Sequence, residues 1–138
     1  MSVTEHLAEQ QLLLVSDPNN IVLIEPFIES FRCDNQITDE IYGNMLVAIT
    51  EAVNNAIVHG NKSDKEKKVK INLLRMKNLV VCAVEDEGHG FDFTNLPDPT
   101  APENIQNTGG RGVFLMKNLS DMVIFSNDGS FVEIQFKL

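Results

Sequence analysis

The spacing of apolar and polar positions predicts one long helix near the middle of the chain. Apolar side chains recur every three to four residues between Ile41 and Val58, which is the period of a helix with one buried side. Thr38 or Asp39 suits the start of this helix, because a side-chain oxygen can satisfy the free amides of the first turn. Gly60 suits its end, because glycine tolerates the backbone that terminates a helix.

The same kind of pattern predicts further helices and strands on both sides of it. Residues 20–32 have helical spacing, with Ser16 or Asp17 as a cap and Pro18 in the first turn. Pro26 is expected to kink this helix, because proline supplies no amide hydrogen. A last helix is expected at residues 112–119. Apolar or alternating runs predict strands at residues 11–17, 68–76, 79–84, 122–126 and 130–136.

These elements predict an α/β (α+β) protein: a two-layer sandwich of a mixed, mostly antiparallel sheet of four or five strands covered by helices. The length of 138 residues suits one domain, residues 1–138. Residues 91–108 hold three prolines, several amides and little periodicity. We expect a long loop there, and a loop of that length is a candidate lid over a site.

Charge and composition narrow the classes of function. The net charge of −9 argues against a nucleic-acid-binding surface. No apolar run approaches the ~18 residues of a membrane span, and the first residues lack the pattern of a signal peptide, so a cytoplasmic protein is expected. Cys33 and Cys82 are isolated and are expected to be free thiols. Five of the eleven basic residues lie within residues 62–70; a solvated loop is the simpler interpretation, and docking of an acidic partner is the alternative.

The end of the long helix, TEAVNNAIVHGN at residues 50–61, mixes apolar and polar side chains in an unusual way. Glu51, Asn55 and His59 are four residues apart and share one stripe of the helix. A helix that is otherwise buried thus presents a polar face. Taken alone, this stripe could simply face solvent.

Two later segments add glycine-rich turns. VEDEGHGFD at residues 84–92 is an aliphatic strand that runs into Asp86, Gly88 and Gly90. TGGRGVFLMKNL at residues 108–119 places glycines at the start of a helix, where free amides and the helix dipole favour an anion. It is neither a Walker A loop, because no Gly-Lys-Ser/Thr follows, nor a dinucleotide fingerprint, because that pattern fails at Leu115. Structural turns remain the alternative for both segments.

In this order and spacing, the three segments resemble the N, G1 and G2 boxes of the GHKL ATPase superfamily. They are most similar to the small bacterial anti-sigma factor serine kinases, and the resemblance covers roughly residues 12–136. It implies the histidine-kinase-like ATPase fold, with ATP and Mg²⁺ as cofactors. It also implies an ATP-dependent protein serine/threonine kinase that phosphorylates an anti-anti-sigma (antagonist) protein and sequesters a sigma factor.

The resemblance also assigns roles to residues. Asp86 would accept a hydrogen bond from the adenine amino group, while Gly88 and Gly90 would let the backbone approach the purine. Asn55 would bind Mg²⁺, and Glu51 would be the catalytic base. Gly109, Gly110, Arg111, Gly112 and Val113 would bind the phosphates. Asn54 and His59 are expected to support the helix end rather than react.

One departure from the family pattern lies near the end of the chain. Ser130 and Phe131 stand where relatives often carry paired threonines, one of which helps to hold the adenine-binding aspartate; the Ser130 hydroxyl is the candidate substitute. Residues 93–108 carry no family signature.

Sensor histidine kinases and gyrase-like ATPases are disfavoured, because neither a dimerisation helix nor a transducer domain is expected here. The alternative function is an ATP-binding interaction module without kinase activity. Relatives are often homodimers, which the sequence leaves open; neither nucleic acid nor membrane is an expected partner.

Overall fold

In the part of the chain that the structure describes, one five-stranded sheet packs against three α-helices. The computed structural model describes residues 6–88 and 108–138. The strand order is β1-β2-β3-β5-β4, and all four described pairings are antiparallel. The strands are β1 (His6–Val15), β2 (Lys68–Met76), β3 (Leu79–Glu85), β4 (Met122–Ser126) and β5 (Phe131–Lys137). The α-helices are α1 (Ile24–Asn35), α2 (Asp39–Asn54) and α3 (Thr108–Leu119).

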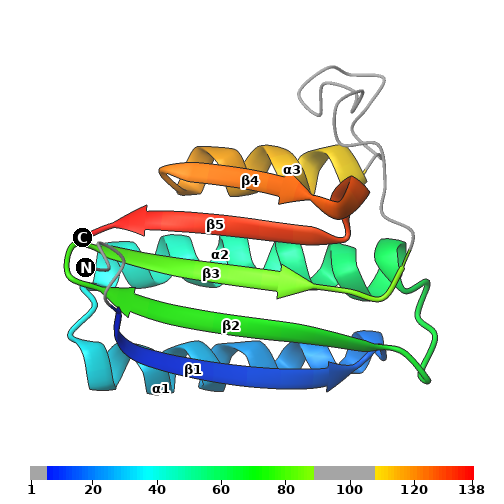
Figure 1. Cartoon of the computed structure of the whole chain (residues 1–138), viewed down its shortest axis with the longest axis horizontal. Coiled ribbons are helices and arrows are strands. Elements are labelled where there is room, and N and C mark those ends of the chain that lie inside the picture. The colour runs from blue at the N-terminus through cyan, green and yellow to red at the C-terminus, as the bar shows by residue number, and fades with distance from the viewer. Residues whose placement is uncertain (1–5, 89–107) are drawn as a thin grey trace.

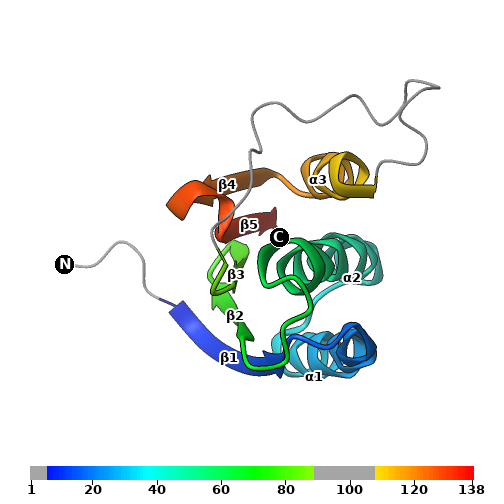
Figure 2. The same ribbon diagram turned by 90° about the vertical axis from the view of Figure 1, so that its right-hand side faces the viewer.

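The three helices lie on the same face of the sheet, which confirms the expected two-layer α+β class (Figures 1 and 2). Figure 2 shows α1 and α2 beside β1, β2 and β3, with α3 next to β4 and β5. The alternation of side chains along β2 explains the layering: Val69, Ile71 and Leu73 are fully buried, and residues two apart in a strand share one face. Together with the inner faces of the helices they form the core.

Helix α2 begins and ends as its sequence predicts, with one addition. The Thr38 side chain caps the first turn by accepting from the Ile41 amide at 3.4 Å. At its other end the helix continues as one π-helical turn, Asn55–Gly60, in which the Asn61 amide donates to the carbonyl of Ala56, five residues earlier. A π-turn rotates the side chains that follow it and often marks a functional site. The sequence period did not reveal this turn.

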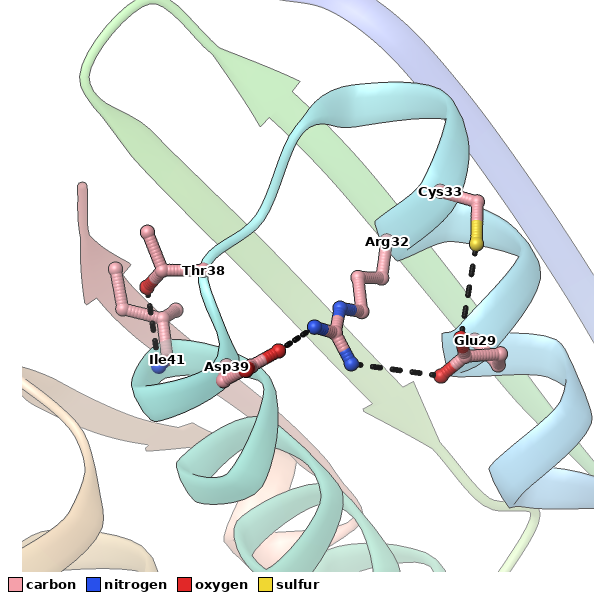
Figure 3. A network of polar contacts seen from close by, with 6 residues as sticks. All are labelled: Glu29, Arg32, Cys33, Thr38, Asp39 and Ile41. Atoms are coloured by element: carbon pink, nitrogen blue, oxygen red, sulfur yellow. Dashed lines mark hydrogen bonds and ion pairs between the residues drawn. The ribbon is translucent and has the colours of Figure 1, made fainter.

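The connection between α1 and α2 is held by a polar cluster centred on Arg32 (Figure 3). Its guanidinium pairs with Asp39 in the first turn of α2 and lies 3.8 Å from the Glu29 carboxylate. The same group stacks over the Tyr42 ring, 4.5 Å from its centroid. The Cys33 thiol donates to Glu29 at 3.6 Å. These contacts fix where α2 starts, and so where its later residues point.

Three expectations about element bounds need correction. Pro26 does not kink α1, because it lies in the first turn, where the amide has no partner within the helix; a separate 3-10 helix, Pro18–Leu23, capped by Asp17, precedes it. Helix α3 starts at Thr108 rather than at residue 112. Strand β1 starts at His6 rather than at residue 11, because its pairing with β2 continues to Met76.

The remaining expectations concern single residues and segments. Cys33 and Cys82 are free, with Cys33 exposed and Cys82 buried. No helix in the described part of the chain is long and apolar enough to cross a bilayer. The expected lid at residues 91–108 lies outside the described residues, except for its last one.

Candidate active site

A small pocket lies where α2 meets the ends of β3 and β5. Its walls come from α2 and its π-turn, from α3, and from the strands β3, β4 and β5 with the turn that joins the last two. The lining residues are Ala52, Asn55, Ala56, Val84, Asp86, Met116, Phe125, Gly129, Ser130 and Val132. Asp86 and Asn55, both assigned to nucleotide binding from the sequence, thus share one pocket. Its other walls are mostly apolar, as a flat purine would require.

Asp86 is the best-defined polar group of this pocket. Its backbone amide donates to the Ser130 carbonyl at 2.9 Å, and its Oδ1 accepts from the Gly88 amide at 2.8 Å. Within residues 6–88 and 108–138, no hydrogen bond reaches Oδ2, which lies against Gly60. Burial raises the pKa of this carboxyl, and Glu85 adds to the rise, while the Gly88 amide and Lys67 oppose it.

Gly60 and Gly88 both lie close to the Asp86 carboxylate. A Cβ placed on Gly60 would overlap the carboxylate, and a Cβ placed on Gly88 would overlap the Gly60 carbonyl. Only glycine, which has no side chain, fits at contacts this short. The end of the π-turn and the G1 segment are therefore in contact at this point. Gly88 is therefore required for this contact whether or not a nucleotide is bound.

Glu51 and Asn55 lie one helical turn apart on α2 and both face α3. A Cβ on Gly112 would lie 3.1 Å from Oε2 of Glu51 and 3.2 Å from Nδ2 of Asn55. Gly112 is buried, so the start of α3 packs directly against these two polar groups. Asn55 is 9% exposed, and Glu51 is partly exposed. The N and G2 segments, far apart in the sequence, are thus adjacent in the fold.

The other residues of the G2 segment differ in position. Gly109, Gly110 and Arg111 lie in the first turn of α3, where backbone amides are free to bind an anion. Arg111 is exposed. The Val113 side chain is 3% exposed and belongs to the core, and its amide lies in the second turn of α3, beyond the free amides of the helix start. Gly90 lies outside the described residues.

One part of the site differs from the sequence-based expectation. The Ser130 hydroxyl donates to the Asn127 carbonyl at 2.9 Å rather than to the Asp86 carboxylate, so Ser130 holds Asp86 through its backbone carbonyl. His59 is exposed at the end of the π-turn. The apolar wall residues Met116 and Phe125 could have been inferred only from helix and strand faces, because their residue types carry no chemistry of their own.

The donor set fits a magnesium ion held mainly by phosphates. Asn55 offers one amide oxygen beside the start of α3, and Mg²⁺ commonly takes one or two protein oxygens and completes its shell with phosphates and water. No cluster of three or more His, Cys, Asp or Glu within residues 6–88 and 108–138 could hold a metal by itself. Asn55 is therefore the residue that would hold the ion.

A partly buried carboxylate at the end of β3, an amide one turn from a second carboxylate, and a glycine-rich helix start are together typical of a nucleotide-binding domain. The chain belongs to the histidine kinase-like ATPase domain family, whose model matches residues 14–136. This family implies that ATP is used. The resemblance drawn from the three boxes is therefore confirmed.

Named relatives lie within one group of bacterial regulators. The chain is 34% identical over 95 residues to "Serine-protein kinase RsbW" of Bacillus subtilis, covering 64% of this chain and 59% of that protein. It is 34% identical to "Anti-sigma F factor" of Geobacillus stearothermophilus, covering 66% and 63%. It is 33% identical over 108 residues to "Anti-sigma F factor" of Bacillus thuringiensis, covering 75% and 73%. The match thus spans less than two thirds of the length of the first two relatives.

Proposed function

We propose that this protein is an ATP-dependent protein serine/threonine kinase that also acts as an anti-sigma factor. It transfers the γ-phosphoryl group of ATP to a hydroxyl of a small anti-anti-sigma protein, and it sequesters a sigma factor. The names of its relatives support this assignment. The single observation that carries it is the meeting of Glu51 and Asn55 with Gly112, next to the pocket of Asp86.

In this proposal the pocket binds adenine. The Asp86 carboxylate accepts a hydrogen bond from the exocyclic amino group of adenine. Guanine has a carbonyl in place of this donor, so the carboxylate favours ATP over GTP. Gly88 lets the backbone approach the base, and Gly90 is assigned the same role. The triphosphate lies at the start of α3, over the amides of Gly109 and Gly110 and near Arg111. Gly112 and Val113 lie further along the helix, where the amides are already paired.

The catalytic step then uses Glu51 and Asn55. Asn55 would hold Mg²⁺, which when bound neutralises charge on the phosphates. The Glu51 carboxylate takes the proton of the attacking serine or threonine hydroxyl as the new phosphate oxygen bond forms and ADP leaves. Their spacing of one helical turn suits two oxygens that act on one reaction centre. Gly112 supports this geometry by keeping the space between α2 and α3 small.

The test is phosphotransfer to the antagonist. The protein is incubated with Mg²⁺, γ-labelled ATP and each small candidate antagonist encoded beside it, and sigma factor binding is measured with and without nucleotide. Label on a serine or threonine of one candidate is the expected result. ATP binding and sigma factor binding without any transfer would instead identify an interaction module. We expect these reactions to take place in the cytoplasm. We also propose that the protein is a homodimer, which analytical ultracentrifugation would test.

A further inference from the structure

The side chain of Asn61 is buried directly behind the proposed adenine site. It follows the π-turn of α2 and is only 1% exposed. Its Oδ1 accepts from the backbone amide of Glu87 at 2.8 Å. Its Nδ2 donates to the Lys68 carbonyl at 3.0 Å and to the Ser16 hydroxyl at 2.8 Å. Both ends of the amide are engaged, as a buried polar side chain requires.

Asn61, Lys68 and Glu87 form a closed ring of hydrogen bonds. The Glu87 carboxylate accepts from the Lys68 amide at 2.5 Å, while Asn61 bonds to the Lys68 carbonyl and to the Glu87 amide. The ring joins the end of the π-turn, the start of β2 and the segment after β3. Ser16 lies outside the ring and bonds to it from the end of β1.

One member of the ring, Glu87, is the residue that follows Asp86. The Glu87 amide belongs to the peptide group that follows Asp86, so the bond from Asn61 fixes the orientation of that peptide. The peptide before Asp86 is fixed on the other side by the Ser130 carbonyl. The Gly88 amide holds the carboxylate directly through Oδ1, and the backbone that carries the carboxylate is held by one bond from the turn of β4 and β5 and by one from Asn61.

We infer that Asn61 is a positioning residue of the nucleotide site, which aims the Asp86 carboxylate through the Glu87 amide. The inference rests on the proposed ATP binding. It explains why a polar side chain is buried at the end of a helix whose other buried contacts are largely apolar. Only an amide offers an acceptor to Glu87 and donors to Lys68 from one planar group.

Substitutions of Asn61 separate positioning from mere stability. Asn61→Leu keeps the size and removes all three bonds; ATP affinity measured by calorimetry with Mg²⁺ should fall about tenfold, the scale of one lost hydrogen bond. Hydrogen exchange of the Glu87 amide should become faster. Asn61→Asp keeps the acceptor and should recover part of the affinity. Should the leucine variant not fold, Asn61→Ser, which is one bond too short to reach Glu87, takes its place.

Ser16→Ala is the matched control. It removes a bond to the same Asn61 amide from a buried position, but it leaves the bond to Glu87 intact. It should lower the melting temperature while ATP affinity stays within about twofold. Equal loss of affinity in the Ser16 and Asn61 variants, or wild-type affinity in a folded Asn61→Leu protein, overturns the inference. Wild-type protein that binds no ATP would overturn the proposed function instead, and exchange at Glu87 would still report on the bond.

Discussion

Burial of the Asp86 carboxylate affects folding and ligand binding in opposite directions. The folded protein binds a proton at Asp86 more readily than the unfolded chain does, because burial raises the pKa of this group. Stability therefore falls as the pH rises from the ordinary pKa of an aspartate through the raised one. In the proposed function, the ionised form, which lowers stability, is also the form that would offer adenine an acceptor. Burial of the ionised carboxylate thus lowers the stability of the folded protein.

Asp86→Asn should separate these two effects. Its Oδ1 can still accept from Gly88, but the second atom becomes a donor facing the adenine amino group. ATP affinity should weaken by about 1.5–3 kcal/mol, while the melting temperature at neutral pH should not fall. Calorimetric titration and thermal unfolding at several pH values check both parts. Unchanged affinity in the folded variant would contradict the adenine assignment.

Glu51 and Asn55 should differ in what their loss removes. Glu51→Gln keeps size and hydrogen bonding but has no basic oxygen, so phosphotransfer should fall by roughly 10²- to 10⁴-fold with little change in ATP affinity. Asn55→Ala should instead lose the magnesium-dependent part of ATP binding. Single-turnover transfer and titrations with and without Mg²⁺ distinguish the two. A glutamine variant with the wild-type transfer rate would rule out the role given to Glu51.

At the scale of elements, the packing of α3 against α2 depends on glycine at position 112, which has no side chain. Gly112→Ala would place a methyl group 3.1 Å from Glu51 and 3.2 Å from Asn55, which forces both side chains to move. Phosphotransfer should fall by about tenfold or more, because small displacements of reacting groups are expensive. The folded state should lose little, since the two side chains can yield.

Gly43→Ala is the control for this substitution. Gly43 lies within α2, and an added Cβ there would meet nothing within 4 Å. The variant should gain about 1 kcal/mol of stability from helix propensity and keep full activity. Chemical denaturation and the transfer assay measure both variants side by side. Similar loss of activity in the two variants would show that the Gly112 contact is unimportant.

The elements also show where sequence reasoning succeeds. The bounds of β2 and α2 followed from periodicity and caps, because Val69, Ile71 and Leu73 alternate cleanly and Thr38 has a hydroxyl to offer. The π-turn before Gly60 was missed, since it leaves the apolar pattern unchanged and alters only the backbone. The role of Pro26 was misjudged, because the start of α1 depends on the 3-10 helix before it.

At the scale of the molecule, the three sequence boxes correctly indicated residues that the fold brings together. Glu51, Asn55 and Asp86 were identifiable because their segments resemble the family's boxes in order and spacing, whereas the polar stripe alone could have faced solvent. Asn61 was not, since its partners, Ser16, Lys68 and Glu87, come from three other elements. Hydrogen bonds between backbone and side chain over such separations have no signature along the chain.

The central strand offers a way to measure the opening of the whole protein. Cys82 lies in β3, between Leu73 of β2 and Ile134 of β5, and is fully buried; burial raises the pKa of its thiol. Cys33 is exposed. A thiol reagent should therefore label one cysteine at once and the second only when the helices leave the sheet.

The rate of that second labelling should track the equilibrium between the folded and open forms. If Mg²⁺ and ATP bind only the folded form, they should slow it about 100-fold at 100 times the dissociation constant. Mass spectrometry of the labelled protein over time checks this, with a Cys33→Ser variant to isolate the slow site. Equal rates at both thiols would contradict the burial of Cys82. The chain thus carries an internal reporter of its own occupancy, which requires no introduced cysteine and no partner protein.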